Sequence, residues 1–177
     1  MNSFWFLLKR WFIEMGSPPL FFNWSSKIVT WLGISAISFL LLGLYWGLIL
    51  APPDYKQGDV FRILYIHVPS AIMGESIFIF MAFCGFINVI WRAKISGMMI
   101  KSAAPIGMSF VLLTLLTGSI WGKPTWGTWW VWDARLTSTL ILFFIYMALI
   151  GLHSTIDDKT KADRAVSILA IVGVAII

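Results

Sequence analysis

Apolar residues occur along this chain of 177 residues in long runs, separated by short segments where charged residues gather. Four runs have about the length that a helix needs to cross a hydrocarbon layer of about 30 Å. They cover residues 28–50, 69–91, 103–120 and 137–152, and a shorter fifth run covers residues 165–177. The pattern predicts an all-α fold: a polytopic integral membrane helix bundle with four full transmembrane helices and a truncated fifth. Thr137 or Ser138 is the expected N-cap of the fourth helix.

Composition supports a membrane protein. Hydrophobic residues make up 59% of the chain and charged residues 12%, whereas soluble proteins have about 25% charged residues. This balance excludes a water-soluble globular protein. The formal net charge of +5 would suggest nucleic acid in a soluble protein, but here it is expected to reflect the position of basic residues relative to the bilayer, and no nucleic-acid partner is expected.

The distribution of Lys and Arg predicts the orientation. Assigning alternate loops to opposite sides places nine basic residues on one side and four on the other. The richer side holds Lys9, Arg10, Lys27, Arg92, Lys94, Lys101, Lys159, Lys161 and Arg164, and the poorer side holds Lys56, Arg62, Lys123 and Arg135. The positive-inside rule then places the N-terminus in the cytoplasm. Residues 1–27, rich in aromatic side chains, are expected to form a cytoplasmic or interfacial segment, and residues 28–177 a single membrane domain.

The fifth apolar run is short. A helix over residues 165–177 would reach only about 20 Å, less than the thickness of the apolar layer. We expect either a sequence truncated at its C-terminus or a last segment that lies in the interface without crossing.

Tryptophan is concentrated in one predicted outer loop, residues 121–136. Five of the chain's eleven tryptophans lie there, and they are Trp121, Trp126, Trp129, Trp130 and Trp132. Indoles at this position suit three roles: interfacial anchors, core packing, or a shelf for a broad, flat, mostly apolar ligand. The spacing alone leaves all three open.

Heme meets the requirements of the third role, because it combines a flat macrocycle, two propionates and an iron that accepts histidine. The tryptophans would line the macrocycle, Arg135 and Lys123 would reach the propionates, and Asp133 would orient Arg135 or an indole N–H. His67, in the other outer loop, could ligate the iron. The simpler alternatives are a hydrogen-bonded loop histidine and a surface ion pair between Asp133 and Arg135.

Two further residues bear on function. Glu75 is an ionisable group inside the second run, so it is either functional or a hydrogen-bonded group facing the bundle. Cys84 is the single cysteine, which excludes a disulfide framework and a Cys-x-x-Cys-His heme attachment site.

Residues 126–137, Trp-Gly-Thr-Trp-Trp-Val-Trp-Asp-Ala-Arg-Leu-Thr, resemble the WWD signature of heme-handling membrane proteins, in the form found in the cytochrome c maturation protein C family. Four other segments resemble that family in order and spacing: Ala51–Gly58, Arg62–Pro69, Ala104–Gly107 and Thr117–Pro124. Related WWD proteins usually have Trp-Asp-Pro-Lys-Glu where this chain has Trp-Asp-Ala-Arg-Leu, and this difference favours the C-type family.

The resemblance implies a six-span protein, with both termini cytoplasmic, in the bacterial inner membrane rather than the mitochondrial one. Such a protein binds heme b at the outer face and delivers it to a periplasmic heme chaperone for c-type cytochrome biogenesis. It implies further partners: subunits of an ABC-type transporter, other maturation membrane proteins and membrane lipid. The function is transfer and presentation of heme, with no independent catalytic residue.

In that family two histidines flanking the WWD segment are the axial ligands of the iron. The first corresponds to His67, and the second has no counterpart in this chain. His153 matches it in neither position nor side. Two alternatives stay open: a membrane scaffold or transporter subunit whose tryptophans are anchors, and a truncated fragment without function.

Overall fold

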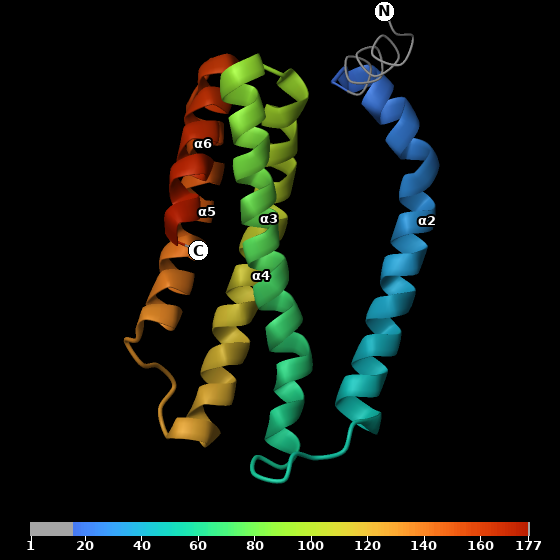
Figure 1. The fold of residues 1–177 in the computed structure, drawn as a ribbon, viewed down its shortest axis with the longest axis vertical. Coiled ribbons are helices and arrows are strands. Elements are labelled where there is room, and N and C mark those ends of the chain that lie inside the picture. Colours follow the sequence, from blue (N-terminus) through green and yellow to red (C-terminus); the bar gives the residue numbers. More distant parts are fainter. Residues whose placement is uncertain (1–15, 177) are drawn as a thin grey trace, which may run out of the picture.

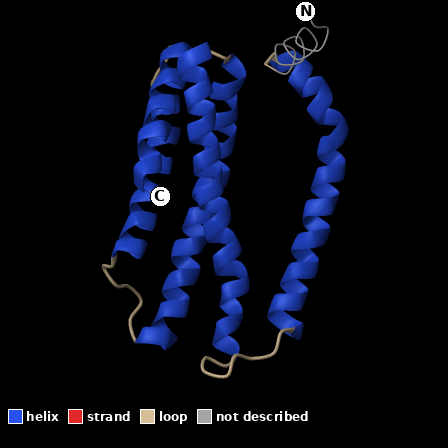
Figure 2. Ribbon diagram, viewed as in Figure 1, coloured by secondary structure: helices blue, strands red, loops and turns tan. Residues whose placement is uncertain are grey.

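The computed structural model describes residues 16–176, which form helices joined by loops (Figures 1 and 2). The five longer helices are α2 (Pro18–Tyr45), α3 (Leu64–Trp91), α4 (Lys94–Trp126), α5 (Ala134–Thr155) and α6 (Lys159–Gly173). Three short turns of helix complete the order: a π-helical turn at Trp46–Leu50 and 3-10 turns at Asp59–Ile63 and Val174–Ile176. Most of the predicted segment 1–27 lies outside the described residues.

Four of the described helices are long and apolar enough to cross a membrane: Pro18–Leu50, Asp59–Trp91, Lys94–Trp126 and Ala134–Thr155. Helix α6 follows as a fifth, shorter element. The predicted fold class, an all-α membrane helix bundle, is therefore confirmed. Helices α3 to α6 pack together, while α2 stands apart for most of its length (Figure 1).

The bundle has two chemically different ends. The loops at residues 51–58 and 127–133 lie together at the lower end in Figure 1, which we name the tryptophan end. The connections at residues 92–93 and 156–158 lie at the opposite end, which we name the basic end. The segment that carries His67 therefore lies at the same end of the molecule as the tryptophan stretch.

The helices extend beyond the apolar runs. Helix α2 begins at Pro18, ten residues before the predicted span, because prolines in the first turn of a helix lose no hydrogen bond. Helix α3 begins at Leu64 after a 3-10 turn, so His67 lies on a helix and not in a loop. At the other end of α3, Arg92 adopts a left-handed conformation, with φ of 52°, and the chain turns directly into α4.

Part of the predicted loop 121–136 is helical. Helix α4 continues to Trp126 and ends where Gly127 adopts a left-handed conformation, with φ of 84°. The N–H of Gly127 donates to the carbonyl of Lys123 at 3.1 Å, a common way to end a helix. The loop proper is therefore residues 127–133.

One aromatic residue links three helices in the core. Tyr146 on α5 is fully buried, and its hydroxyl donates to the carbonyl of Gly74 on α3 at 2.8 Å. It passes over Gly107 on α4, where a Cβ would collide with the phenol ring. Phe78 meets the Tyr146 ring edge-on, with centroids 5.2 Å apart. Small residues thus let the helices approach around one phenol, as in many membrane bundles.

Tyr146→Phe is expected to lower the free energy of unfolding by about 0.5–1.5 kcal/mol. The ring remains, but the hydroxyl that bonds Gly74 is lost. The measurement is unfolding in detergent micelles followed by tryptophan fluorescence. Tyr45→Phe is the matched control, because the Tyr45 side chain is exposed and its loss should change little. Equal effects of the two substitutions would contradict the hydrogen bond.

Helix α2 is attached to the bundle at the tryptophan end. A Cβ at Gly47 would lie 2.6 Å from the Tyr65 ring, and the Arg62 guanidinium donates to the carbonyl of Leu48. Near Gly43, which pairs with Gly47 in a small-xxx-small pattern, no atom of the described residues outside its own helix lies within 4 Å. No residue of α2 is buried, and most of its side chains are exposed, where lipid or another helix would meet them.

Candidate functional site at the tryptophan end

His67 lies between α3 and α4. Its ring is half-buried, and Nδ1 is 3.0 Å from the Thr117 hydroxyl oxygen on α4. Gly118 allows this approach, since a Cβ there would lie 3.0 Å from His67 Cε1. The Trp121 ring meets the imidazole edge-on, with centroids 5.7 Å apart. The histidine is therefore held by three consecutive contacts along one face of α4.

Trp121 is a structural support. Its indole N–H donates to the side-chain oxygen of Gln57 at 2.7 Å, and Phe61 packs edge-on at 6.5 Å. Asp54 shapes the loop that carries Gln57, because it accepts the backbone N–H groups of Gln57 at 2.8 Å and Lys56 at 2.9 Å. These two hydrogen bonds hold the pKa of Asp54 below its usual value. Trp121 thus joins the loop 51–58 to the end of α4.

Trp130 has an unsatisfied donor. Its indole Nε1 is buried and makes no hydrogen bond to any described residue. A buried donor without a partner costs about 1–3 kcal/mol. Such groups are rare in folded proteins, so this one suggests a hydrogen-bond partner that is not part of the described chain. Trp132 packs edge-on against the Trp130 ring at 5.5 Å. In contrast with Trp130, Trp129 and Trp132 are largely exposed on the surface of the loop.

Asp133 and Arg135 begin α5. The Asp133 carboxylate accepts the backbone N–H of Leu136 at 2.7 Å and is therefore the N-cap, a position expected from sequence at Thr137 or Ser138. Its other oxygen is 3.7 Å from Arg135. The Arg135 guanidinium also lies 6.0 Å from the Trp126 ring centroid, within reach of a cation–π contact.

Lys123 lies at the edge of this group. Its ammonium donates to the carbonyl of Gly127 at 3.1 Å and lies 6.0 Å from the Trp129 ring centroid. It therefore supports the end of α4 and adds positive charge beside the exposed tryptophans.

A cavity of about 150 Å³ opens between α3, α4 and α5 at this end. Five of the nine predicted site residues line it, and these are His67, Trp121, Trp126, Trp130 and Arg135. The other four, Lys123, Trp129, Trp132 and Asp133, lie around it without lining it. Glu75 lines the cavity two helical turns from His67 on the same face of α3. The lining also includes hydroxyl groups that sequence reasoning missed, from Thr114, Ser119 and Thr139.

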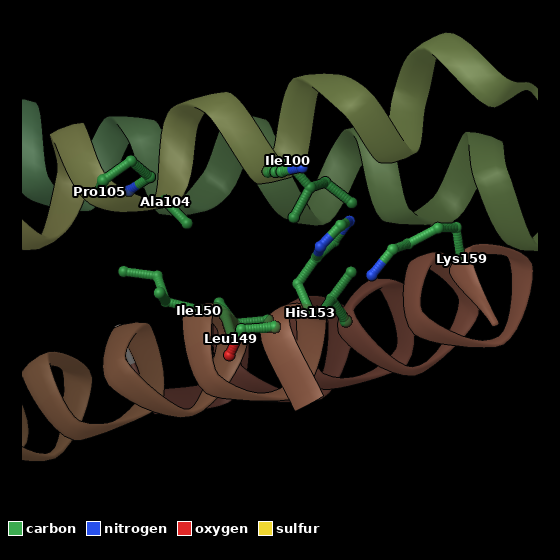
Figure 3. A pocket seen from close by; sticks show the side chains of 10 residues that line it. Ile100, Ala104, Pro105, Leu149, Ile150, His153 and Lys159 are labelled. Atoms are coloured by element: carbon green, nitrogen blue, oxygen red, sulfur yellow. The ribbon is translucent and has the colours of Figure 1, made fainter. Parts of the chain in front are cut away.

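A larger cavity of about 280 Å³ lies at the basic end (Figure 3). It is mostly apolar, with His153 and Lys159 at its rim, both labelled in Figure 3. His153 Nε2 is 3.2 Å from the Asp163 carboxylate. The two histidines of the chain therefore occupy opposite ends of the bundle, as the alternation of spans predicts.

A third cavity, of about 400 Å³, also lies at the basic end and is lined mainly by polar and charged residues such as Asn88, Arg92 and Lys161. Chemistry, more than volume, distinguishes the cavity at the tryptophan end from these two. The tryptophan end combines indole faces, an imidazole, a buried unsatisfied N–H and the exposed cation of Arg135. In residues 16–176 no three side chains among His, Cys, Asp and Glu form a group that could hold a metal ion. Indole faces, an imidazole and a cation together suit a flat, largely apolar ligand that carries an acidic group.

Comparison with known proteins leads to a single family. Residues 11–177 match the family described as heme exporter protein C. Heme exporter protein C of Escherichia coli K12 is 44% identical over 161 residues, covering 91% of this chain and 66% of that protein. The Haemophilus influenzae protein of the same name is 40% identical over 168 residues, covering 95% and 68%, and that of Bradyrhizobium diazoefficiens is 42% identical over 161 residues, covering 91% and 61%. The chain thus spans about two thirds of the length of these relatives, and it belongs to the heme exporter protein C family.

Proposed function

We propose that this chain binds heme at the tryptophan end and presents it to an acceptor on the outer side of the membrane, for the maturation of c-type cytochromes. The observation that carries the proposal is the cavity in which His67, three indoles and Arg135 converge. Relatives that are 40–44% identical bear the name heme exporter protein C, and heme is the ligand that this chemistry would select.

The size of the cavity supports a proposed arrangement in which heme is only partly enclosed. About 150 Å³ is less than the roughly 300–1,000 Å³ of sites that enclose a small molecule. The cavity therefore receives one edge of the macrocycle beside His67, and the rest lies over the exposed faces of Trp126, Trp129 and Trp132. A ligand bound on a shelf of this kind keeps an open edge for transfer to another protein.

Each polar group has a role in this arrangement. His67 would hold the iron through its imidazole, and Arg135 and Lys123 would attract the propionates. The Trp130 N–H, unsatisfied in the described structure, gains an acceptor from a propionate oxygen. Asp133 holds the start of α5 and orients Arg135, and Trp121 supports the His67 ring. Heme supplies the redox and covalent chemistry, and the protein supplies orientation.

The orientation and partners follow from the same proposal. The tryptophan end faces the periplasm across the bacterial inner membrane, and the N-terminus is cytoplasmic, as the distribution of Lys and Arg indicates. The acceptor is a periplasmic heme chaperone. Subunits of an ABC-type transporter and other maturation membrane proteins complete the set of proposed partners.

The test is a titration of the purified chain with hemin in detergent micelles, followed by the Soret absorption. Saturable binding with a shifted Soret band is expected. The variant Trp129→Ala/Trp130→Ala should lose most of that binding, and Trp31→Ala, an exposed indole on α2, should not. A folded parent chain that does not shift the Soret band would contradict the proposal and favour the alternative in which the tryptophans are membrane anchors.

Trp130→Phe should lower hemin affinity and leave the stability of the ligand-free chain about unchanged. Removing a buried N–H without a partner relieves a cost of about 1–3 kcal/mol, which offsets the loss of indole packing, so the ligand-free chain should be about as stable as the parent. Hemin affinity should fall about 10–100-fold, since one hydrogen bond to a charged group contributes about 1.5–3 kcal/mol. Unfolding and hemin titration on the same sample measure both. Unchanged affinity would exclude the Trp130 N–H as a ligand contact.

A further inference from the structure

We propose that Thr117 fixes the tautomer of His67, with the proton on Nδ1 and the free lone pair on Nε2, and is thereby a positioning residue for the iron ligand. The proposal has two parts: the tautomer of His67, and the role of Thr117 in positioning the iron ligand. The second part rests on the proposed function, because it concerns the nitrogen that His67 offers to heme iron. The first part, the tautomer, is a property of the protein alone.

The hydroxyl of Thr117 has one proton and several neighbours. Its oxygen is 2.7 Å from the carbonyl of Leu113, one turn back along α4, and 3.3 Å from the carbonyl of Thr114. Carbonyl oxygens only accept, and threonine in a helix commonly donates to the carbonyl four residues earlier. The short contact to Leu113 therefore takes the hydroxyl proton.

His67 must then be the donor in its own contact with Thr117. The distance from Nδ1 to the hydroxyl oxygen is 3.0 Å, and with the hydroxyl proton committed to Leu113 only the oxygen lone pairs remain. A neutral imidazole carries one proton, so Nδ1–H leaves Nε2 deprotonated. The hydrogen bond between His67 and a side chain uses Nδ1, and the Thr114 backbone carbonyl, which can only accept, also calls for an N–H on the ring. A free lone pair of this kind is what a metal requires, and histidine ligands are usually oriented through their other nitrogen.

The surroundings keep the ring in this position. Thr117 is buried, so water does not compete for its oxygen. The backbone at Gly118 and the edge of Trp121, on the same face of α4, also contact the imidazole. The ring therefore cannot turn to exchange its two nitrogens without losing these contacts.

His153 provides an internal contrast. Its Nε2 faces the Asp163 carboxylate at 3.2 Å, and a carboxylate only accepts, so neutral His153 carries its proton on Nε2. The two histidines of the chain are thus expected to be opposite tautomers. Thr114 is the matched side-chain control for Thr117: it is equally buried and lines the same cavity, but its hydroxyl donates to the carbonyl of Phe110 at 2.9 Å and not to His67. Its backbone carbonyl, which also accepts from the His67 ring, is kept in Thr114→Val.

The test is nitrogen-15 NMR of histidine-labelled chain without heme, above the usual imidazole pKa of about 6.5. A His153→Gln variant leaves the signals of His67 alone. We expect a protonated Nδ1 and an unprotonated Nε2 in the parent chain, in Thr114→Val and in Thr117→Ser, which keeps the hydroxyl. Thr117→Val should shift the proton toward Nε2. Protonated Nε2 in the parent, or an unchanged spectrum in Thr117→Val, would overturn the proposal, and the parent result stands even where the valine variant does not fold.

A hemin titration of the same proteins tests the second part of the proposal, the positioning role of Thr117. Affinity should fall about 10–100-fold in Thr117→Val, the usual cost of losing the partner that orients a metal ligand, and should recover in Thr117→Ser. The expected tautomer without hemin binding to the parent would overturn the proposed function and leave the tautomer assignment intact. Hemin binding that is unchanged in Thr117→Val would overturn the positioning role.

Discussion

Gly85→Ala is expected to destabilise the bundle by about 1–3 kcal/mol, the usual cost of forcing an extra carbon into a packed interior. A Cβ at Gly85 on α3 would lie 2.7 Å from the carbonyl oxygen and 3.2 Å from the Cα of Ser167 on α6. Both are backbone atoms, so no rotamer change can relieve the collision. The two helices would have to separate, and separation weakens the contacts of Val166 and Ala170, which are fully buried with Ser167.

The control is the same substitution on another apolar helix. Around Gly33 on α2 no described atom beyond its own helix lies within 4 Å, so Gly33→Ala should be neutral or stabilising by up to about 1 kcal/mol, as alanine favours a helix over glycine. Unfolding by a denaturing detergent, followed by helical circular dichroism, compares the two. If both substitutions stabilise the chain equally, α6 does not pack closely against α3.

Gly85 and Gly33 both lie on apolar helices, and the sequence alone does not distinguish their packing. The apolar runs predict the number of long helices because a span needs a minimum apolar length, and that prediction is confirmed. Which glycines allow close packing depends on how the helices rotate about their axes. Gly43 and Gly47 form a small-xxx-small pair, but only Gly47 of the two lies against a neighbouring helix, whereas Gly74, Gly85 and Gly107 are among the close contacts of the core.

The sequence predicts some of the helix boundaries correctly and others not. Gly127 is a typical C-terminal signal, and its left-handed conformation ends α4 within the predicted tryptophan loop. Asp133, a good N-cap residue, begins α5. Sequence reasoning assigned Asp133 to ligand chemistry and the cap to Thr137 or Ser138, because the apolar run begins after Arg135. The structure gives Asp133 the cap, and its contact with Arg135 at 3.7 Å shows that the two roles are compatible.

The candidate site followed from topology more than from motif spacing. Counting alternate spans placed His67 and the tryptophans on one side, and the structure brings His67, Trp126 and Trp130 to one cavity. The supporting contacts could not be foreseen. Gln57 and Trp121 are 64 residues apart in sequence, and Thr117 and His67 are 50 apart, so their pairing depends on the packing of α3 against α4.

Within the proposed function, His67→Ala should have the largest effect on ligand binding. The imidazole is the one histidine side chain that lines the cavity, and it is held by Thr117, Gly118 and Trp121. Loss of an outer partner of a metal ligand costs about 10–100-fold in affinity, so loss of the ligand itself should exceed about 100-fold. The remaining binding would come from the indole shelf and Arg135. The measurement is a hemin titration of the purified variant, read by Soret absorption and by quenching of tryptophan fluorescence.

His153→Ala is the matched control, because these are the two histidines of the chain and His153 lies at the basic end beside Asp163. Its substitution should leave hemin affinity and the Soret position unchanged. Added imidazole should restore the Soret position in His67→Ala, since a free ligand can enter the space that the side chain vacates, and should change His153→Ala no more than the parent. If His153→Ala loses hemin and His67→Ala keeps it, the ligand binds at the basic end and the tryptophan end serves as a membrane anchor.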